Sequence, residues 1–175
     1  MKLGTRSTLL FVALMMTCAA VGESIPKVDA DSLDGHKVSL PADFAGKPAI
    51  LVTCFTKAGG PQCGLFARKL YKEPDVAAGK LKVFQIAMLA GAPRFVRPMI
   101  LHGMRGGVPQ PEQATFLPLY KDEKEWKQAT GYVAAGENDA YLLLVNPDGT
   151  IRWSGHGLYS DSLYAEFKAH LLRSN

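Results

Sequence analysis

Three runs of apolar residues recur along the chain and predict the central strands of a sheet. They cover residues 49–55, 81–88 and 140–145, and each has the length of a strand with few polar residues inside it. Continuous apolar runs of this length are typical of strands covered on both faces. We therefore expect the three runs to form the middle of a buried, mixed sheet.

A helical period separates the first two runs. Apolar residues recur there at i, i+3, i+4 and i+7, as on one face of a helix: Cys63, Phe66, Ala67 and Leu70. The helix is expected to begin at the Gly-Gly-Pro turn of residues 59–61 and to end by Pro74. The result is a β-α-β unit, which implies two parallel strands joined by a right-handed crossover.

The remaining segments complete the predicted order of elements. An Asp-Gly turn in residues 32–40 predicts a hairpin, and a turn at residues 146–149 pairs the third run with residues 150–153. Helices are predicted at residues 122–130 and 161–173, the second capped by Ser160. Residues 90–115 carry four prolines, and we expect irregular chain with short helical turns near residues 95–102. This order predicts an α/β fold, a thioredoxin-like three-layer sandwich with a central mixed β-sheet.

The first 22 residues have the build of a secretory signal peptide. Lys2 and Arg6 precede an uncharged apolar run at residues 9–21, and small residues follow it. The run is short for a membrane span, which needs roughly 20 apolar residues. We therefore expect a signal peptide at residues 1–22 and one domain at residues 23–175, exported to the periplasm or the cell exterior. The alternatives are an uncleaved membrane anchor and lipid modification of Cys18.

Charge and composition exclude some functions. Hydrophobic residues make up 47% of the chain and charged residues 21%, an ordinary globular balance. The net charge is +4, and removal of Lys2 and Arg6 leaves 18 basic and 16 acidic residues. We therefore expect no nucleic-acid partner. The four histidines have no paired ligand spacing, so no metal and no cofactor are predicted. A copper or haem delivery module that uses His102 or His156 remains an alternative.

The start of the first core helix is where a thioredoxin fold holds its Cys-x-x-Cys motif. A helix N-terminus lowers the pKa of a thiol there and favours the reactive thiolate. Gly59 and Gln62 occupy the two positions in this chain, and Ala140 stands near the position of the proline that borders the site in redox members. One thiol cannot exchange two electrons alone, which argues against dithiol–disulfide exchange at this motif.

Cys63 is the remaining candidate for thiol chemistry. Thr56, Gly60 and Cys63 have the spacing of the peroxiredoxin Pro-x-x-x-Thr-x-x-Cys motif, but the first two residue types differ. Cys63 also lies on the apolar face of its helix, and a buried structural role is the other interpretation. Cys54 lies within a strand and is expected in the core. A Cys54–Cys63 disulfide is not expected, because bridging needs Cα atoms within about 7 Å.

Several segments resemble the ATP10-type assembly factors of the mitochondrial ATP synthase. The similarity covers residues 40–47 and the Ile-Arg-Trp-x-Gly-x-Gly segment at residues 151–157. It also covers the family's Gly-Glu-x-Gln-x-x-x-Phe pattern at Gly59, Gln62 and Phe66, where Gly60 replaces the Glu. The resemblance implies an assembly factor that contacts a membrane proton-channel subunit. The chain departs from this family at its N-terminus, which is similar to a bacterial export signal.

Two groups of residues are predicted to bind a partner. The resemblance points to Gln62 and Phe66, and interface chemistry points to a second set of arginines and a tryptophan: Arg94, Arg97, Arg105, Arg152 and Trp153. The first three arginines are interspersed with apolar residues in a long loop, a mixture that suits a protein client or an anionic membrane surface. The alternative is a solvated basic face above a buried apolar core.

The leading hypothesis is an exported protein without a dithiol site that binds a client, as an assembly factor for a membrane or envelope protein complex. It treats the chain as a binding protein and not as an enzyme. The alternative is a one-cysteine, peroxiredoxin-like thiol peroxidase or reductase with Cys63 as its catalytic residue.

Overall fold

The computed structural model describes residues 23–172, so the predicted signal peptide lies outside the described residues. A two-stranded hairpin, β1 (Val28–Asp31) with β2 (Lys37–Leu40), precedes the main sheet. That sheet is five-stranded, in the order β5-β4-β3-β6-β7. Its strands are β5 (Phe116–Leu119), β4 (Lys82–Met88), β3 (Ala49–Cys54), β6 (Ala140–Val145) and β7 (Ile151–Gly157).

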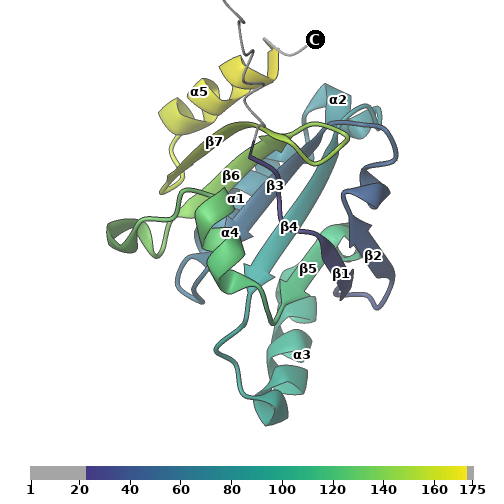
Figure 1. Cartoon of the computed structure of the whole chain (residues 1–175), viewed down its shortest axis with the longest axis vertical. Helices are drawn as coiled ribbons and strands as arrows, with labels where there is room; N and C mark the ends of the chain where they lie inside the picture. Colours follow the sequence, from purple (N-terminus) through teal and green to yellow (C-terminus); the bar gives the residue numbers. More distant parts are fainter. Residues whose placement is uncertain (1–22, 173–175) are drawn as a thin grey trace, which may run out of the picture.

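The three apolar runs form the centre of this sheet, as predicted. β3 pairs in parallel with β4 and antiparallel with β6, and every residue of β3 and β6 is buried. β5 joins β4 in parallel, and β7 pairs antiparallel with β6 (Figure 1). The mixed sheet predicted from the sequence is therefore confirmed.

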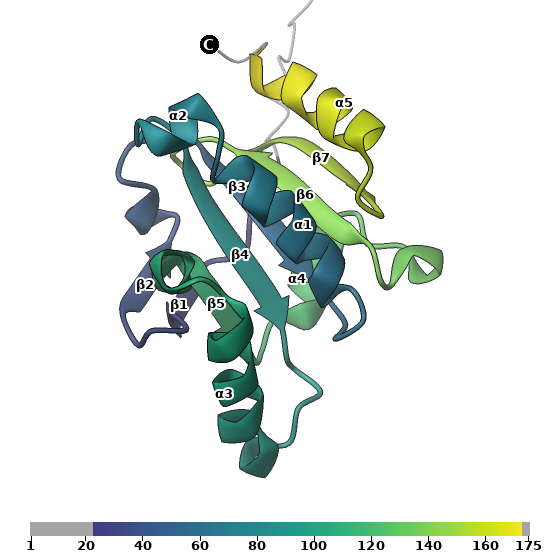
Figure 2. The same ribbon diagram turned by 180° about the vertical axis from the view of Figure 1, so that it is seen from behind.

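Helices cover both faces of the sheet and complete three layers. α1 (Gly60–Leu70) and α5 (Asp161–Leu172) pack on one face through Phe66 and Phe167. α4 (Glu123–Ala129) packs on the other face through Trp126, together with the β1–β2 hairpin. Figures 1 and 2 show these two faces in turn. α2 (Pro74–Ala77) is a short helix between α1 and β4.

Residues 90–115 differ from the prediction of irregular chain. They contain α3 (Arg97–Gly107), a regular 11-residue helix, between short 3₁₀ turns at Arg94–Val96 and Gln110–Thr115. Pro98 lies in the first turn of α3, where its missing N–H costs no hydrogen bond. The four prolines suggested irregular chain, but each of them lies in the first turn of the helix or outside it, where proline does not break a helix.

Contacts outside the helix hold α3 in place. The Arg97 guanidinium lies 4.1 Å from the centre of the Tyr120 ring, and Arg105 Nε donates to the Leu33 carbonyl at 2.7 Å. Leu101 and Met104 pack against the core on the α1 side of the sheet. Figure 2 shows α3 beyond the end of β4, away from the other helices.

Candidate functional site

A cleft of about 680 Å³ lies where α1 and α3 meet the carboxyl ends of β3 and β4. We call it the α1–α3 cleft. Its inner surface includes Cys54 from β3 and Met88 from β4, and α3 contributes Met99, Ile100 and Met104. Lys57 and Arg68 add cations to this lining. The volume is that of a typical ligand pocket, and most of the lining is apolar.

The two positions of the thioredoxin dithiol motif have structural roles in this chain. A Cβ atom on Gly59 would lie 3.1 Å from the carbonyl oxygen of Asn138, so a side chain at position 59 would crowd the loop before β6. Gln62 Oε1 accepts a hydrogen bond of 2.8 Å from the backbone N–H of Tyr159. Gln62 therefore connects the first turn of α1 to the segment between β7 and α5.

The loop between β3 and α1 is fixed by a small polar network. The Thr56 hydroxyl accepts from the N–H of Gly59 at 2.9 Å and donates to Asn138 Oδ1 at 2.7 Å. Because Asn138 lies just before β6, the network joins the β3–α1 loop to the chain that enters the neighbouring strand. This determines where the first turn of α1 lies relative to the end of β3.

Cys54 and Cys63 both line the cleft. Both are free thiols, with exposed fractions of 8% and 3%. The hydrogen bond between the two thiols lowers the pKa of Cys54. The same hydrogen bond, together with burial, raises the pKa of Cys63 well above that of an ordinary thiol. The sequence indicated neither this contact nor that Cys54 lines a cleft.

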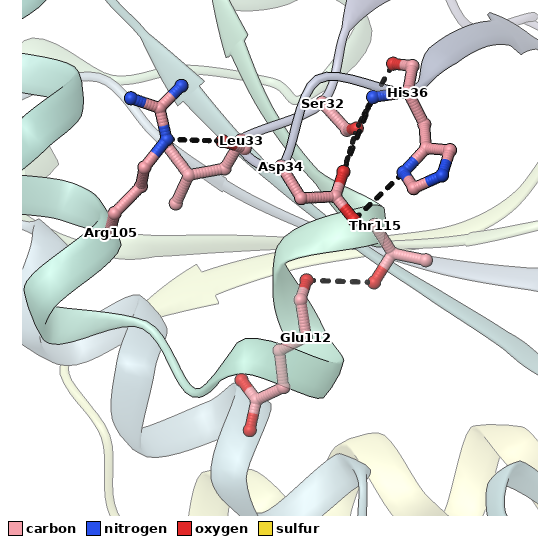
Figure 3. Close-up of polar contacts among 7 residues, drawn as sticks. All are labelled: Ser32, Leu33, Asp34, His36, Arg105, Glu112 and Thr115. Atoms are coloured by element: carbon pink, nitrogen blue, oxygen red, sulfur yellow. Dashed lines mark hydrogen bonds and ion pairs between the residues drawn. The ribbon is translucent and has the colours of Figure 1, made fainter.

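The predicted binding arginines fall into two groups. Arg97 and Arg105 anchor α3 through the contacts described above, and Arg94, Arg105 and Arg152 are exposed. Figure 3 shows Arg105 directed at the carbonyl of Leu33, next to the turn between β1 and β2. In that turn Asp34 accepts hydrogen bonds from Ser32 and His36.

The other predicted binding residues lie mostly inside the fold. Phe66 is fully buried, with its ring centre 5.1 Å from that of Tyr159. Trp153 is half-buried, stacks on His170 with ring centres 5.0 Å apart and packs against Phe167. Their packing contacts are clear from the structure, and their part in binding a client stays a prediction.

The two histidines considered for metal delivery are far from forming a ligand set. His102 is exposed on α3, and His156 Nδ1 lies 2.7 Å from Asp139 Oδ2. Within residues 23–172, His, Cys, Asp and Glu form no group of three that could hold a metal ion.

The apolar wall of the cleft was only partly predictable. The apolar residues interspersed with the arginines include Met99, Ile100 and Met104, and these three line the cleft. Phe95 and Met99 are large apolar side chains that remain 85% and 71% exposed. Gly103 and Gly107 of α3 also line the cleft, and their lack of side chains widens it. Because residues 97–107 contain a proline and three glycines, the sequence did not predict that they form a helix along one side of the cleft.

Comparison with solved structures identifies the fold. The exposed lipoprotein thioredoxin Etrx1 of Streptococcus pneumoniae strain TIGR4 aligns over 82% of this chain and 99% of its own, with a TM-score of 0.57 and 12% identity. A putative thiol:disulfide interchange protein DsbE from Chlorobium tepidum aligns over 87% and 95%, with a TM-score of 0.58 and 14% identity. BsSco, a member of the Sco family of cytochrome c oxidase assembly proteins, aligns over 85% and 94%, with a TM-score of 0.55 and 16% identity.

The chain therefore has the thioredoxin-like fold that its sequence predicts. No protein-family model matches the chain, and no curated protein matches its sequence. Gly59 and Gln62, which the sequence predicts at the positions of the dithiol motif, lie at the start of α1, and the two described cysteines line the α1–α3 cleft.

Proposed function

We propose that this chain is an exported thioredoxin-fold protein that binds a protein client in the α1–α3 cleft, as an assembly factor for a membrane or envelope complex. The observation that carries the proposal is the cleft itself. It lies beside the helix N-terminus at which the fold class exchanges disulfides, but an apolar, methionine-rich wall lines it and Gly59 and Gln62 replace the thiols. Methionine side chains adapt to varied apolar partners, which suits a client-binding surface.

Exposed apolar side chains next to cations support a membrane-embedded client. Met99 lines the cleft, and Phe95, Arg94 and His102 are exposed on the same segment of the chain. An apolar client segment can occupy the cleft while these cations contact its polar ends or anionic headgroups. The resemblance to ATP10-type factors suggests a proton-channel subunit as the client, and the pattern of residues 1–22 suggests export. Within residues 23–172, no helix is long and apolar enough to span a bilayer.

The alternative function, a thiol peroxidase that uses Cys63, has less support. A peroxidatic cysteine must be a thiolate that substrate can reach. Cys63 is buried, and its thiol interacts with Cys54 in a way that raises its pKa. A peroxide would meet a buried, protonated sulfur in the first turn of α1.

Filling the cleft tests the proposal. A Cβ atom at Gly103 or at Gly106 meets no atom within 4 Å, but only Gly103 lines the cleft. A photo-crosslinking amino acid at Met99 of the full chain, expressed in cells, should form an adduct with an envelope membrane protein that mass spectrometry identifies. Gly103→Leu should reduce this adduct at least about tenfold, the effect of about 1.4 kcal/mol, and Gly106→Leu should leave it unchanged.

Two results would contradict the proposed function. One is equal crosslinking in the Gly103→Leu and Gly106→Leu chains, which would place the client elsewhere. The other is consumption of hydroperoxide by the purified chain at an enzyme-like rate that Cys63→Ser abolishes, which would establish the peroxidase.

A further inference from the structure

We infer that the outer face of α3 docks on an anionic membrane surface, with Phe95 and Met99 inserted among the lipid chains and Arg94 at the headgroups. The helix that carries this face also forms one wall of the α1–α3 cleft. Phe95 does not line that cleft, so the inference stands whether or not a protein client enters it.

The helix α3 has an inner and an outer face. Leu101 and Met104 on the inner face pack against the core on the α1 side of the sheet. The outer face carries Phe95, Met99 and His102, which recur at i, i+4 and i+7, the spacing of one side of a helix. Phe95 lies in the 3₁₀ turn that leads directly into α3. The outer side of such a helix is normally polar, and here it presents two large apolar side chains.

These two side chains are the most exposed large apolar residues of the described chain. Leu158, after β7, comes next with an exposed fraction of 59%. Neighbouring exposed apolar side chains of this size mark a surface that binds a protein or a membrane. Figures 1 and 2 both show α3 at one end of the molecule, apart from the other helices. A helix in this position can reach a flat bilayer without obstruction from the rest of the domain.

The charges around the outer face favour an anionic bilayer over a protein surface. Residues 90–111 contain three arginines and one histidine but no Asp or Glu. Within residues 23–172, the side chains of Arg94 and His102 form no hydrogen bond or ion pair. A protein partner must place acidic groups opposite such cations, whereas anionic headgroups meet them at any position. Lipid chains also accept Phe95 and Met99 without a shaped pocket.

Docking through this face also places the cleft beside the membrane. Met99 belongs both to the outer face of α3 and to the lining of the α1–α3 cleft. When Met99 contacts lipid, the cleft therefore lies at the membrane surface, which is the position that a membrane-embedded client requires.

Photo-crosslinking to lipid tests the docking face. A benzophenone amino acid replaces Phe95 in the purified full chain, and in a second chain it replaces Leu158. Each chain is irradiated with vesicles of phosphatidylglycerol and phosphatidylcholine in equal amounts, or of phosphatidylcholine alone. With the anionic vesicles, position 95 should give at least about tenfold more lipid adduct than position 158, because only the first side chain is buried in lipid. Phosphatidylcholine alone should give little adduct at either position. General binding through the rest of the chain affects both probes equally.

Charge variants test the contribution of Arg94. In the chain with the probe at position 95, Arg94→Gln should reduce the lipid adduct about fivefold. Arg152→Gln is the matched control, because it removes an exposed arginine from β7 and should leave the adduct unchanged. Hydrogen exchange of the unmodified full chain is an independent measurement: anionic vesicles should slow exchange of the α3 amides and leave the β7 amides unchanged.

Three results would overturn the inference. They are equal lipid adducts at positions 95 and 158, equal effects of Arg94→Gln and Arg152→Gln, and a probe at position 95 that reacts in cells with a protein and not with lipid. None of these results removes the client adduct expected at Met99, so the docking face and the proposed client binding can fail separately.

Discussion

At the scale of single residues, Asp34 shows how a turn can depend on pH. Hydrogen bonds from Ser32 and then from His36 lower the pKa of this carboxyl from 3.8 to about 2. Because the pKa is lower in the folded chain, the carboxylate stabilises the fold above pH 3.8. That contribution is lost as the pH falls towards about 2.

We therefore expect Asp34→Asn to destabilise the fold at neutral pH by about 1 kcal/mol, a typical value for a lost hydrogen bond. The difference from the unmodified chain should shrink below pH 3.8 and vanish near pH 2, as measured by urea unfolding at a series of pH values. Glu166→Gln, which removes an exposed carboxylate on α5, is the control and should show no such convergence. A difference that stays constant down to pH 2 would contradict the role given to Asp34.

Substitution of Phe66 tests whether this residue stabilises the core or binds a partner directly. Its side chain is fully buried between α1 and the sheet, whereas the neighbouring Leu65 is 36% exposed. Phe66→Ala should lower the free energy of unfolding by about 3–5 kcal/mol, and Leu65→Ala by about 0.5 kcal/mol or less. Urea unfolding followed by circular dichroism measures both. A small effect of Phe66→Ala would mean that this residue contributes little to the core and would favour a direct role in binding.

At the scale of elements, α3 depends on contacts outside itself. It has no fully buried residue and contains three glycines, which are poor helix formers. Arg105→Met keeps the aliphatic stem but removes the hydrogen bond to the Leu33 carbonyl. The loss of such a charged hydrogen bond, about 1.5 kcal/mol, should speed hydrogen exchange of the α3 amides about tenfold.

Hydrogen exchange measured by mass spectrometry checks this prediction, with α1 as the internal reference. Arg94→Met is the matched control, because Arg94 is exposed just before α3. Equal exchange rates in the two variants would show that Arg105 does not hold the helix.

The elements also show what sequence could and could not predict. The strands β3, β4 and β6 followed from apolar runs, and α1 followed from a helical period, because burial on both faces or on one face leaves a direct pattern. β5 and the full length of α3 were not predicted, although short helical turns were expected near residues 95–102. α3 contains Pro98 and three glycines, β5 has only four residues with Pro118 among them, and the contacts of Arg97 and Arg105 come from distant segments.

The candidate site was missed for a similar reason. The sequence could show that Gly59 and Gln62 stand where the dithiol motif is expected, because locating that motif requires only the predicted start of one helix. The sequence does not show that Cys54 and Cys63 line one cleft, because the β3–α1 loop between them is held by Asn138, a residue far along the chain. A periodicity argument places Cys63 on an apolar face but does not indicate that a second thiol lines the same cleft.

At the scale of the whole molecule, one sheet supports two apolar clusters. Successive residues of β3 alternate between them: Ile50 and Val52 pack towards α1, and Leu51 packs towards α4. Neither cluster can separate from the sheet without exposing strands that the other also uses. This sharing predicts that residues 23–172 unfold in one cooperative transition.

The chain carries one tryptophan on each side of the sheet, which makes this prediction measurable. Trp126 is buried on the α4 side, and Trp153 packs against α5 on the other. In a Trp126→Phe chain only Trp153 fluoresces, and in a Trp153→Phe chain only Trp126 does. Within each variant, the urea midpoint from fluorescence should equal the midpoint from circular dichroism, although each substitution lowers both. A Trp153 signal that changes at lower urea than the circular dichroism would show that β7 and α5 unfold separately, and that the two faces of the sheet are not one cooperative unit.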